Sequence, residues 1–131
     1  MESFTQLQAW QSGIRLLKEI YTLTEKFPAA ERYELTKQMR RAAMSVLANI
    51  AEGFSKRSAP DKANKYTIAR SECSEILAFL YGAAAVGFIS DSRGKHALSL
   101  AEETGKLLSG LIQAQLAKQI SQVPYAQRPI P

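Results

Sequence analysis

Residues 35–54 read LTKQMRRAAMSVLANIAEGF, and the spacing of the apolar side chains in this stretch decides the fold. These side chains recur at steps of three and four, which places them on one face of an α-helix. They are Leu35, Met39, Ala42, Ala43, Val46 and Ile50. We therefore predict a helix from about Glu31 to Phe54, with Gly53 as its stop.

The same periodicity predicts three further helices. The first runs from about Thr5 to Lys26 and ends before a proline, because the residue that precedes proline is disfavoured in the α region. The third is capped by Ser58 and stops at Gly87. The fourth begins after a cap at Ser90 or Asp91.

The predicted connections are short, so consecutive helices should lie antiparallel. The expected fold is an all-α, up-down-up-down four-helix bundle. With 131 residues, of which 46% are hydrophobic, the chain fits one domain. We assign residues 1–120 to that domain and residues 121–131 to a flexible, proline-containing tail.

The composition indicates a cytoplasmic protein without a membrane partner. The longest apolar or small stretch, Ala83 to Ile89, is far shorter than the ~20 residues of a membrane span. No secretion signal opens the chain. The single cysteine, Cys73, excludes an intrachain disulfide and favours a reducing compartment.

Side chains for catalysis or metal binding are nearly absent, so we expect no enzyme, no catalytic residue, no metal, no cofactor and no small-molecule substrate. His96 is the only histidine, and Cys73 falls on an apolar stripe without a base. Glu72 and Glu75 lack the Glu-x-x-His partners of di-iron bundles and are expected on a solvated face. No glycine has P-loop spacing.

Charge is the most informative feature for function. The chain has 17 Lys+Arg and 12 Asp+Glu, a net charge of +5. Residues 35–70 hold eight of the basic side chains and only two acidic ones, around the predicted second and third helices. Such a patch favours an anionic partner. The candidate nucleic-acid-binding residues are Lys37, Arg40, Arg41, Lys56, Arg57, Ser58, Lys62 and Lys65.

The turn at Lys56-Arg57-Ser58 opens the predicted third helix, where free N–H groups and the helix dipole favour a phosphate. The alternative is a basic turn that only keeps the loop solvated, with Ser58 as an ordinary cap. Sequence-specific recognition is not expected, since no recognition-helix motif and no aromatic cluster for base stacking is present.

Residues 42–51 are apolar nearly all round the predicted helix, whereas a bundle helix normally buries one stripe. This pattern predicts a second buried surface on the helix, formed by another copy of the chain or by a partner. The alternative is that the alanines are exposed as good helix formers. The candidate interface residues are Met44, Leu47, Ala48, Asn49 and Ala51.

Three segments of the chain resemble the 23S ribosomal-RNA intervening-sequence protein family, also called the four helix bundle protein family. They are residues 35–45 (LTKQMRRAAMS), residues 48–54 (ANIAEGF) and Arg57-Ser58. The likeness covers about Leu7 to Ile89. It implies a bacterial cytoplasmic protein, an antiparallel bundle assembled into a ring-like pentamer with a basic surface, and binding of nucleic acid. A related group accompanies diversity-generating reverse transcriptases.

Carried over onto this chain, Arg40 and Arg41 match the family's arginine pair. Asn49 and Glu52 match its Asn-Ile-Ala-Glu-Gly turn and are expected to be structural. Asn49 should bond within the bundle or a subunit interface, and Glu52 with an arginine or Lys56. Leu47 occupies the place of a usual proline, so this helix should be straighter.

Two functions from different classes fit these features. The first is an oligomeric, non-catalytic nucleic-acid-binding protein that holds structured, ribosomal-RNA-like RNA by its phosphates. The second is a protein-interaction module or oligomeric scaffold, accessory to a protein such as a reverse transcriptase, in which the charge is incidental.

Overall fold

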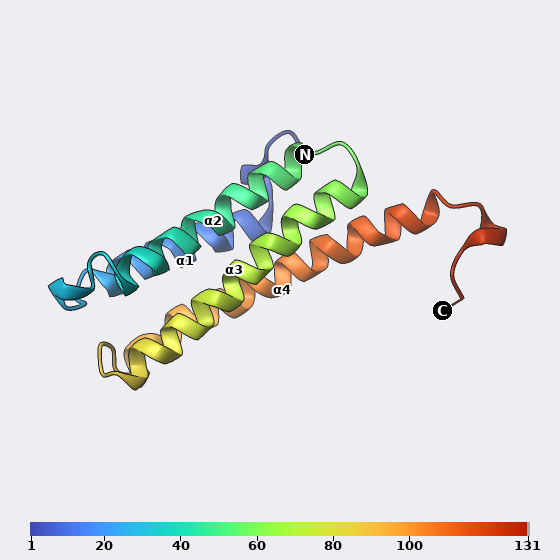
Figure 1. The fold of residues 1–131 in the computed structure, drawn as a ribbon. Helices are drawn as coiled ribbons and strands as arrows, with labels where there is room; N and C mark the ends of the chain where they lie inside the picture. The colour runs from blue at the N-terminus through green and yellow to red at the C-terminus, as the bar shows by residue number, and fades with distance from the viewer. Residues whose placement is uncertain (131) are drawn as a thin grey trace.

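The computed structural model describes residues 1–130, which form four α-helices joined by short turns (Figure 1). The helices are α1 (Gln8–Thr24), α2 (Leu35–Ser55), α3 (Ala59–Ala85) and α4 (Asp91–Ser121). Single turns of 3-10 helix lie at Phe4–Gln6, Ala29–Glu31 and Tyr125–Gln127. Residues 1–130 contain no strand, so the predicted all-α class is confirmed over that range.

Consecutive helices run in opposite directions and pack as a closed circuit, α1 against α2, α2 against α3, α3 against α4 and α4 against α1. The turn between α2 and α3 therefore lies at the same end of the bundle as the start of α1 and the later turns of α4. α4 continues past the start of α3, and the chain after it leads away from the bundle (Figure 1).

The predicted caps begin α3 and α4. The Ser58 hydroxyl accepts a hydrogen bond from the Asp61 N–H at 3.2 Å, and the Ser90 hydroxyl accepts one from the Arg93 N–H at 3.1 Å. Each bond satisfies one of the N–H groups that a helix start leaves without an intrahelical partner. These caps fix where the short turns end and the helices start.

Gly87 ends α3, as predicted, with a positive φ of +82° that disfavours a side chain. The Phe88 N–H donates to the Ala83 carbonyl at 2.9 Å, and the Gly87 N–H donates to the Ala84 carbonyl at 3.1 Å. This pair of bonds is a Schellman motif, which turns the chain sharply into α4.

α2 begins at Leu35, four residues later than the predicted Glu31. Ala29–Glu31 forms a separate 3-10 turn instead, and the Glu31 carboxylate accepts a hydrogen bond from the Leu35 N–H at 3.2 Å. Glu31 therefore satisfies a first-turn N–H of α2 from outside the helix.

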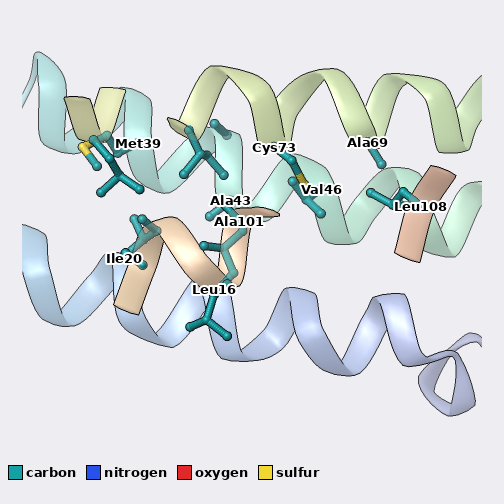
Figure 2. Packing of buried hydrophobic residues seen from close by; sticks show 14 of the residues in the cluster. Leu16, Ile20, Met39, Ala43, Val46, Ala69, Cys73, Ala101 and Leu108 are labelled. Atoms are coloured by element: carbon teal, nitrogen blue, oxygen red, sulfur yellow. The ribbon is translucent and has the colours of Figure 1, made fainter. Parts of the chain in front are cut away.

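The core runs along the inside of all four helices (Figure 2). Its largest fully buried side chains include Leu16 and Ile20 of α1, Met39, Val46 and Ile50 of α2, Cys73, Ile76 and Leu80 of α3, and Leu108 of α4. Most of the predicted stripe of α2 is thus buried, and Leu35 at its start is half-buried. One buried polar contact crosses the core, a 2.7 Å hydrogen bond between the hydroxyls of Ser12 and Thr104.

Leu47 belongs to this core, and its assignment to a subunit interface is wrong. Its side chain is only 6% exposed, and one of its methyl groups fills the space above Gly13 of α1. A Cβ on Gly13 would lie 2.9 Å from the Leu47 Cδ2 atom. The missing side chain of Gly13 therefore makes room for Leu47, and α2 continues unbroken through this position.

Candidate nucleic-acid interface

The cations of the α2–α3 turn face solvent. Lys56 and Arg57 are exposed and follow the end of α2, and Ser58 caps α3 directly after them. No side-chain hydrogen bond or ion pair within residues 1–130 involves Lys56 or Arg57. Both side chains can therefore reach a phosphate without breaking a contact of the bundle.

Lys62 has a different role from the two exposed cations. Its Nζ donates to the carbonyl of Phe54 at 2.7 Å and to that of Gly53 at 3.4 Å, at the C-terminal end of α2. A cation in this position satisfies the last carbonyls of a helix and complements its dipole. Lys62 therefore fastens the start of α3 to the end of α2.

Lys118 of α4 joins the same end of the bundle. Burial, and then the positive charge of Lys118, lower the pKa of Lys62. Like charges held together favour a bound anion. The prediction from the α2–α3 sequence did not include Lys118, although the antiparallel topology itself brings the end of α4 to this turn. We call the set Lys56, Arg57, Lys62, Lys65 and Lys118 the basic end.

Lys65 is partly neutralised within the basic end. Its Nζ lies 3.1 Å from a carboxylate oxygen of Glu52, one turn before the end of α2. Glu52 was expected to pair with an arginine or with Lys56, so the partner is different. The pair is half exposed, so it contributes only about 0–1 kcal/mol to stability.

The remaining predicted cations lie at the opposite end of α2, so the single patch that the sequence predicted is divided. Lys37 is 19 residues from Lys56, a separation of about 28 Å along a helix axis. Lys37 is exposed there.

The Arg40 side chain makes contacts within the bundle. Its guanidinium lies 4.4 Å from the ring centre of Tyr21, its Nε donates to the Thr24 hydroxyl at 2.9 Å, and its Nη2 lies 3.5 Å from the Tyr21 carbonyl. These contacts fasten α2 to the last turn of α1. Arg40 therefore already has partners within the bundle, unlike Lys56 and Arg57.

Arg41 lies beside carboxylates. It lines a polar groove of about 240 Å³ between α2 and α3, together with Gln38, Ser45, Glu72 and Glu75. Burial and then the neighbouring Glu75 raise the pKa of Glu72, whereas Ser45 and Arg41 lower it. Glu72 is half-buried, so the expectation of a fully solvated face holds for Glu75 only.

Four of the five predicted interface residues lie on the outer side of α2. Met44 is 52% exposed, Ala48 is exposed, and Asn49 and Ala51 are half-buried. The Asn49 amide donates to the carbonyl and the hydroxyl of Ser45 at 2.9 and 3.1 Å, so its hydrogen bonds stay within α2.

Residues 1–130 contain no cluster of three or more side chains suited to a metal ion. None of the helices in that range is both long enough and apolar enough to span a bilayer. His96 is exposed on α4. Burial, and then Glu72, raise the pKa of the Cys73 thiol to about 12, which keeps it a neutral core side chain.

Comparison with protein families matches residues 5–110 to the model of the 23S rRNA-intervening sequence protein. This chain belongs to that family. The match includes α1, α2, α3 and most of α4, and therefore all of the basic end except Lys118. The resemblance seen in the sequence is thus confirmed.

A solved structure has the same fold. It is described as a protein of unknown function from the S23 ribosomal protein family of Bacteroides thetaiotaomicron. The two structures superpose with a TM-score of 0.74 at 24% identity, over 80% of this chain and 95% of the other. At that identity the match supports the four-helix fold. A comparison with curated proteins finds no match.

Proposed function

We propose that this protein is a non-catalytic homo-oligomer that binds structured, ribosomal-RNA-like RNA through phosphate contacts at the basic end. The observation that carries the proposal is the meeting of cations from the α2–α3 turn, α3 and α4 around the start of α3. The first turn of a helix adds N–H groups and a partial positive charge that favour an anion.

The exposure and contacts of these cations suggest that they have different roles in binding. Lys56 and Arg57 are exposed and without bundle partners, so they would contact phosphates directly. Lys62 and Lys118 add positive potential behind them. The matched family is named for intervening sequences of 23S rRNA, which favours RNA among polyanions. Phosphate contacts carry no sequence information, so we expect little sequence preference.

Assembly would strengthen such binding. The half-exposed Met44 with Ala48, Asn49 and Ala51 provides an outer surface of α2 for a second copy. Several basic ends in one ring act together, because the first contact raises the effective concentration of the next. The family resemblance suggests five copies. Light scattering in solution measures this number, and a monomer at all concentrations would rule the assembly out.

The test is binding of a ribosomal-RNA hairpin, followed by fluorescence anisotropy at about 50 mM salt. The variant Lys56→Gln/Arg57→Gln should bind about tenfold or more weakly, since it loses two phosphate contacts. Lys18→Gln/Lys26→Gln is the matched control, with the same charge change at exposed sites on and after α1. Absence of saturable binding, or an equal loss in both variants, would refute the proposal.

A second candidate function is a protein-interaction scaffold, for a partner such as a reverse transcriptase. The exposure of Met44 (52%) and Ile68 (37%) on α2 and α3 favours it, because large apolar side chains are costly to leave in water. Met44→Glu and Lys56→Gln/Arg57→Gln, measured together, separate the two functions. The scaffold requires loss of partner binding without any effect of Lys56→Gln/Arg57→Gln.

A further inference from the structure

The last turns of α4 and the chain beyond them form an apolar arm outside the bundle. We define the C-terminal arm as residues 116–130, which lie beyond the part of the chain matched to the family. Leu116 and Ile120 are 45% and 44% exposed, and Tyr125 and Ile130 are 87% and 95% exposed. Apolar side chains gathered in this way mark a surface that binds another surface.

The arm has a defined shape. The Arg128 Nε donates to the Val123 carbonyl at 2.9 Å, and its Nη2 donates to the Ser121 carbonyl at 3.1 Å. The guanidinium also lies 5.9 Å from the ring centre of Tyr125. Arg128 thus folds the chain back onto the end of α4 and keeps Tyr125 next to a positive charge. The arm contains Lys118 and Arg128 but no acidic residue.

An apolar groove lies at the opposite end of the bundle, between the end of α3 and the start of α4. Its volume is about 310 Å³, and its apolar lining includes Leu80, Tyr81, Ala84, Ile89 and Leu98. A cavity of about 150 Å³ already accommodates benzene, so this groove has enough volume for a tyrosine ring. Asp91 and Lys95 lie at its rim, and Asp91 provides a carboxylate that matches Arg128 of the arm.

The arm of one copy cannot reach its own groove. α4 has 31 residues and is about 46 Å long, with the groove at its start and the arm at its end. Tyr125 lies only four residues beyond Ser121, a span of at most about 14 Å even when fully extended. Figure 1 shows the turn between α3 and α4 and the chain after α4 at opposite ends of the molecule.

We propose that the C-terminal arm of one copy binds the α3–α4 groove of a second copy, with the Tyr125 ring in the groove and Arg128 beside Asp91. The contact joins two different surfaces, so each copy offers one arm and one groove. It buries the exposed aromatic ring against the apolar lining. It uses neither Lys56 nor Arg57, the two side chains proposed to contact phosphates directly.

Cysteine cross-linking between two differently substituted copies tests the contact. One copy has Ala126→Cys, beside Tyr125, and the other has Ala84→Cys, in the groove. The native Cys73 is buried, and the pKa of its thiol is raised to about 12, so it does not interfere. The matched control replaces the Ala84→Cys copy by a Thr22→Cys copy, at an exposed site on α1.

After mild oxidation of an equal mixture, the 126–84 disulfide should exceed the 126–22 disulfide at least about tenfold, because docking raises the local thiol concentration. Adding Tyr125→Ala to the arm should remove this excess. Equal yields with the two partners would overturn the proposal. So would a 126–84 disulfide within a single doubly substituted chain, which would mean that the arm folds onto its own bundle.

Discussion

Both ends of α2 carry basic side chains, but the surroundings of these side chains differ between the two ends. At its C-terminal end, Lys56 and Arg57 are exposed beside Lys62 and Lys118. At its N-terminal end, Arg40 lies against Tyr21, and Arg41 lies in a groove with two glutamates. Arg40 holds two helices together, whereas Lys56 and Arg57 have no partner among the side chains of residues 1–130. A count of charges along the sequence does not distinguish these two roles.

The close approach of α2 and α3 at the basic end depends on Gly53. A Cβ there would lie 2.6 Å from the Tyr66 Cε1 atom, and Tyr66 is only 2% exposed. We predict that Gly53→Ala lowers the free energy of unfolding by about 1–3 kcal/mol, because the buried ring cannot move away. Urea denaturation measures the change.

Gly82→Ala is the control for that variant. Gly82 lies within α3, and apart from the backbone of its own helix and its chain neighbours no atom lies within 4 Å of its would-be Cβ, so alanine should stabilise the helix by up to about 1 kcal/mol. Equal stability of the Gly53→Ala variant and the native protein would mean that the two helices are not held this closely.

Arg40 and Arg57 should respond in opposite ways to replacement by alanine. Arg40→Ala removes a charge-assisted hydrogen bond and a cation–π contact, so we expect a loss of about 1–3 kcal/mol in unfolding free energy. Arg57→Ala should change stability by less than about 0.5 kcal/mol and weaken RNA binding. Denaturation and anisotropy on both variants test this, and the reverse pattern would exchange the roles of the two ends.

The fold was largely predictable from the sequence, whereas the roles of individual side chains such as Arg40 and Leu47 were not. Apolar periodicity and the caps Ser58 and Ser90 located the helices, since both depend on local chemistry. The roles of Arg40 and Leu47 depend on contacts with α1, more than a dozen residues away along the chain. Lys118 joins the basic end only through the path of α4.

Removal of the carboxylate at the basic end should have a smaller effect. Glu52→Gln breaks the 3.1 Å ion pair with Lys65 and should cost less than about 1 kcal/mol, as exposed pairs do. The same variant should bind RNA more tightly at low salt, because Lys65 loses its competing anion. Weaker binding by Glu52→Gln would show that Glu52 positions Lys65 for the RNA.

The smallest effect is expected at the other end, in the groove beside Arg41. The pKa of Glu72 is raised in the folded state, chiefly by burial, so its carboxylate destabilises the fold at neutral pH. This cost falls as the pH drops through that pKa and the group is protonated. Glu72→Gln should therefore raise the melting temperature slightly at pH 7, with a smaller gain near pH 4. A lower melting temperature at pH 7 would contradict the assignment.

The salt dependence of RNA binding tests most directly whether the basic end binds phosphates. On a duplex hairpin, each neutralised phosphate contributes about 0.9 to the slope of log affinity against log salt. The native protein should therefore have a steep negative slope, and Lys56→Gln/Arg57→Gln should reduce its magnitude by about 1.8, which Lys18→Gln/Lys26→Gln should not do. Identical slopes for all three proteins would contradict the account.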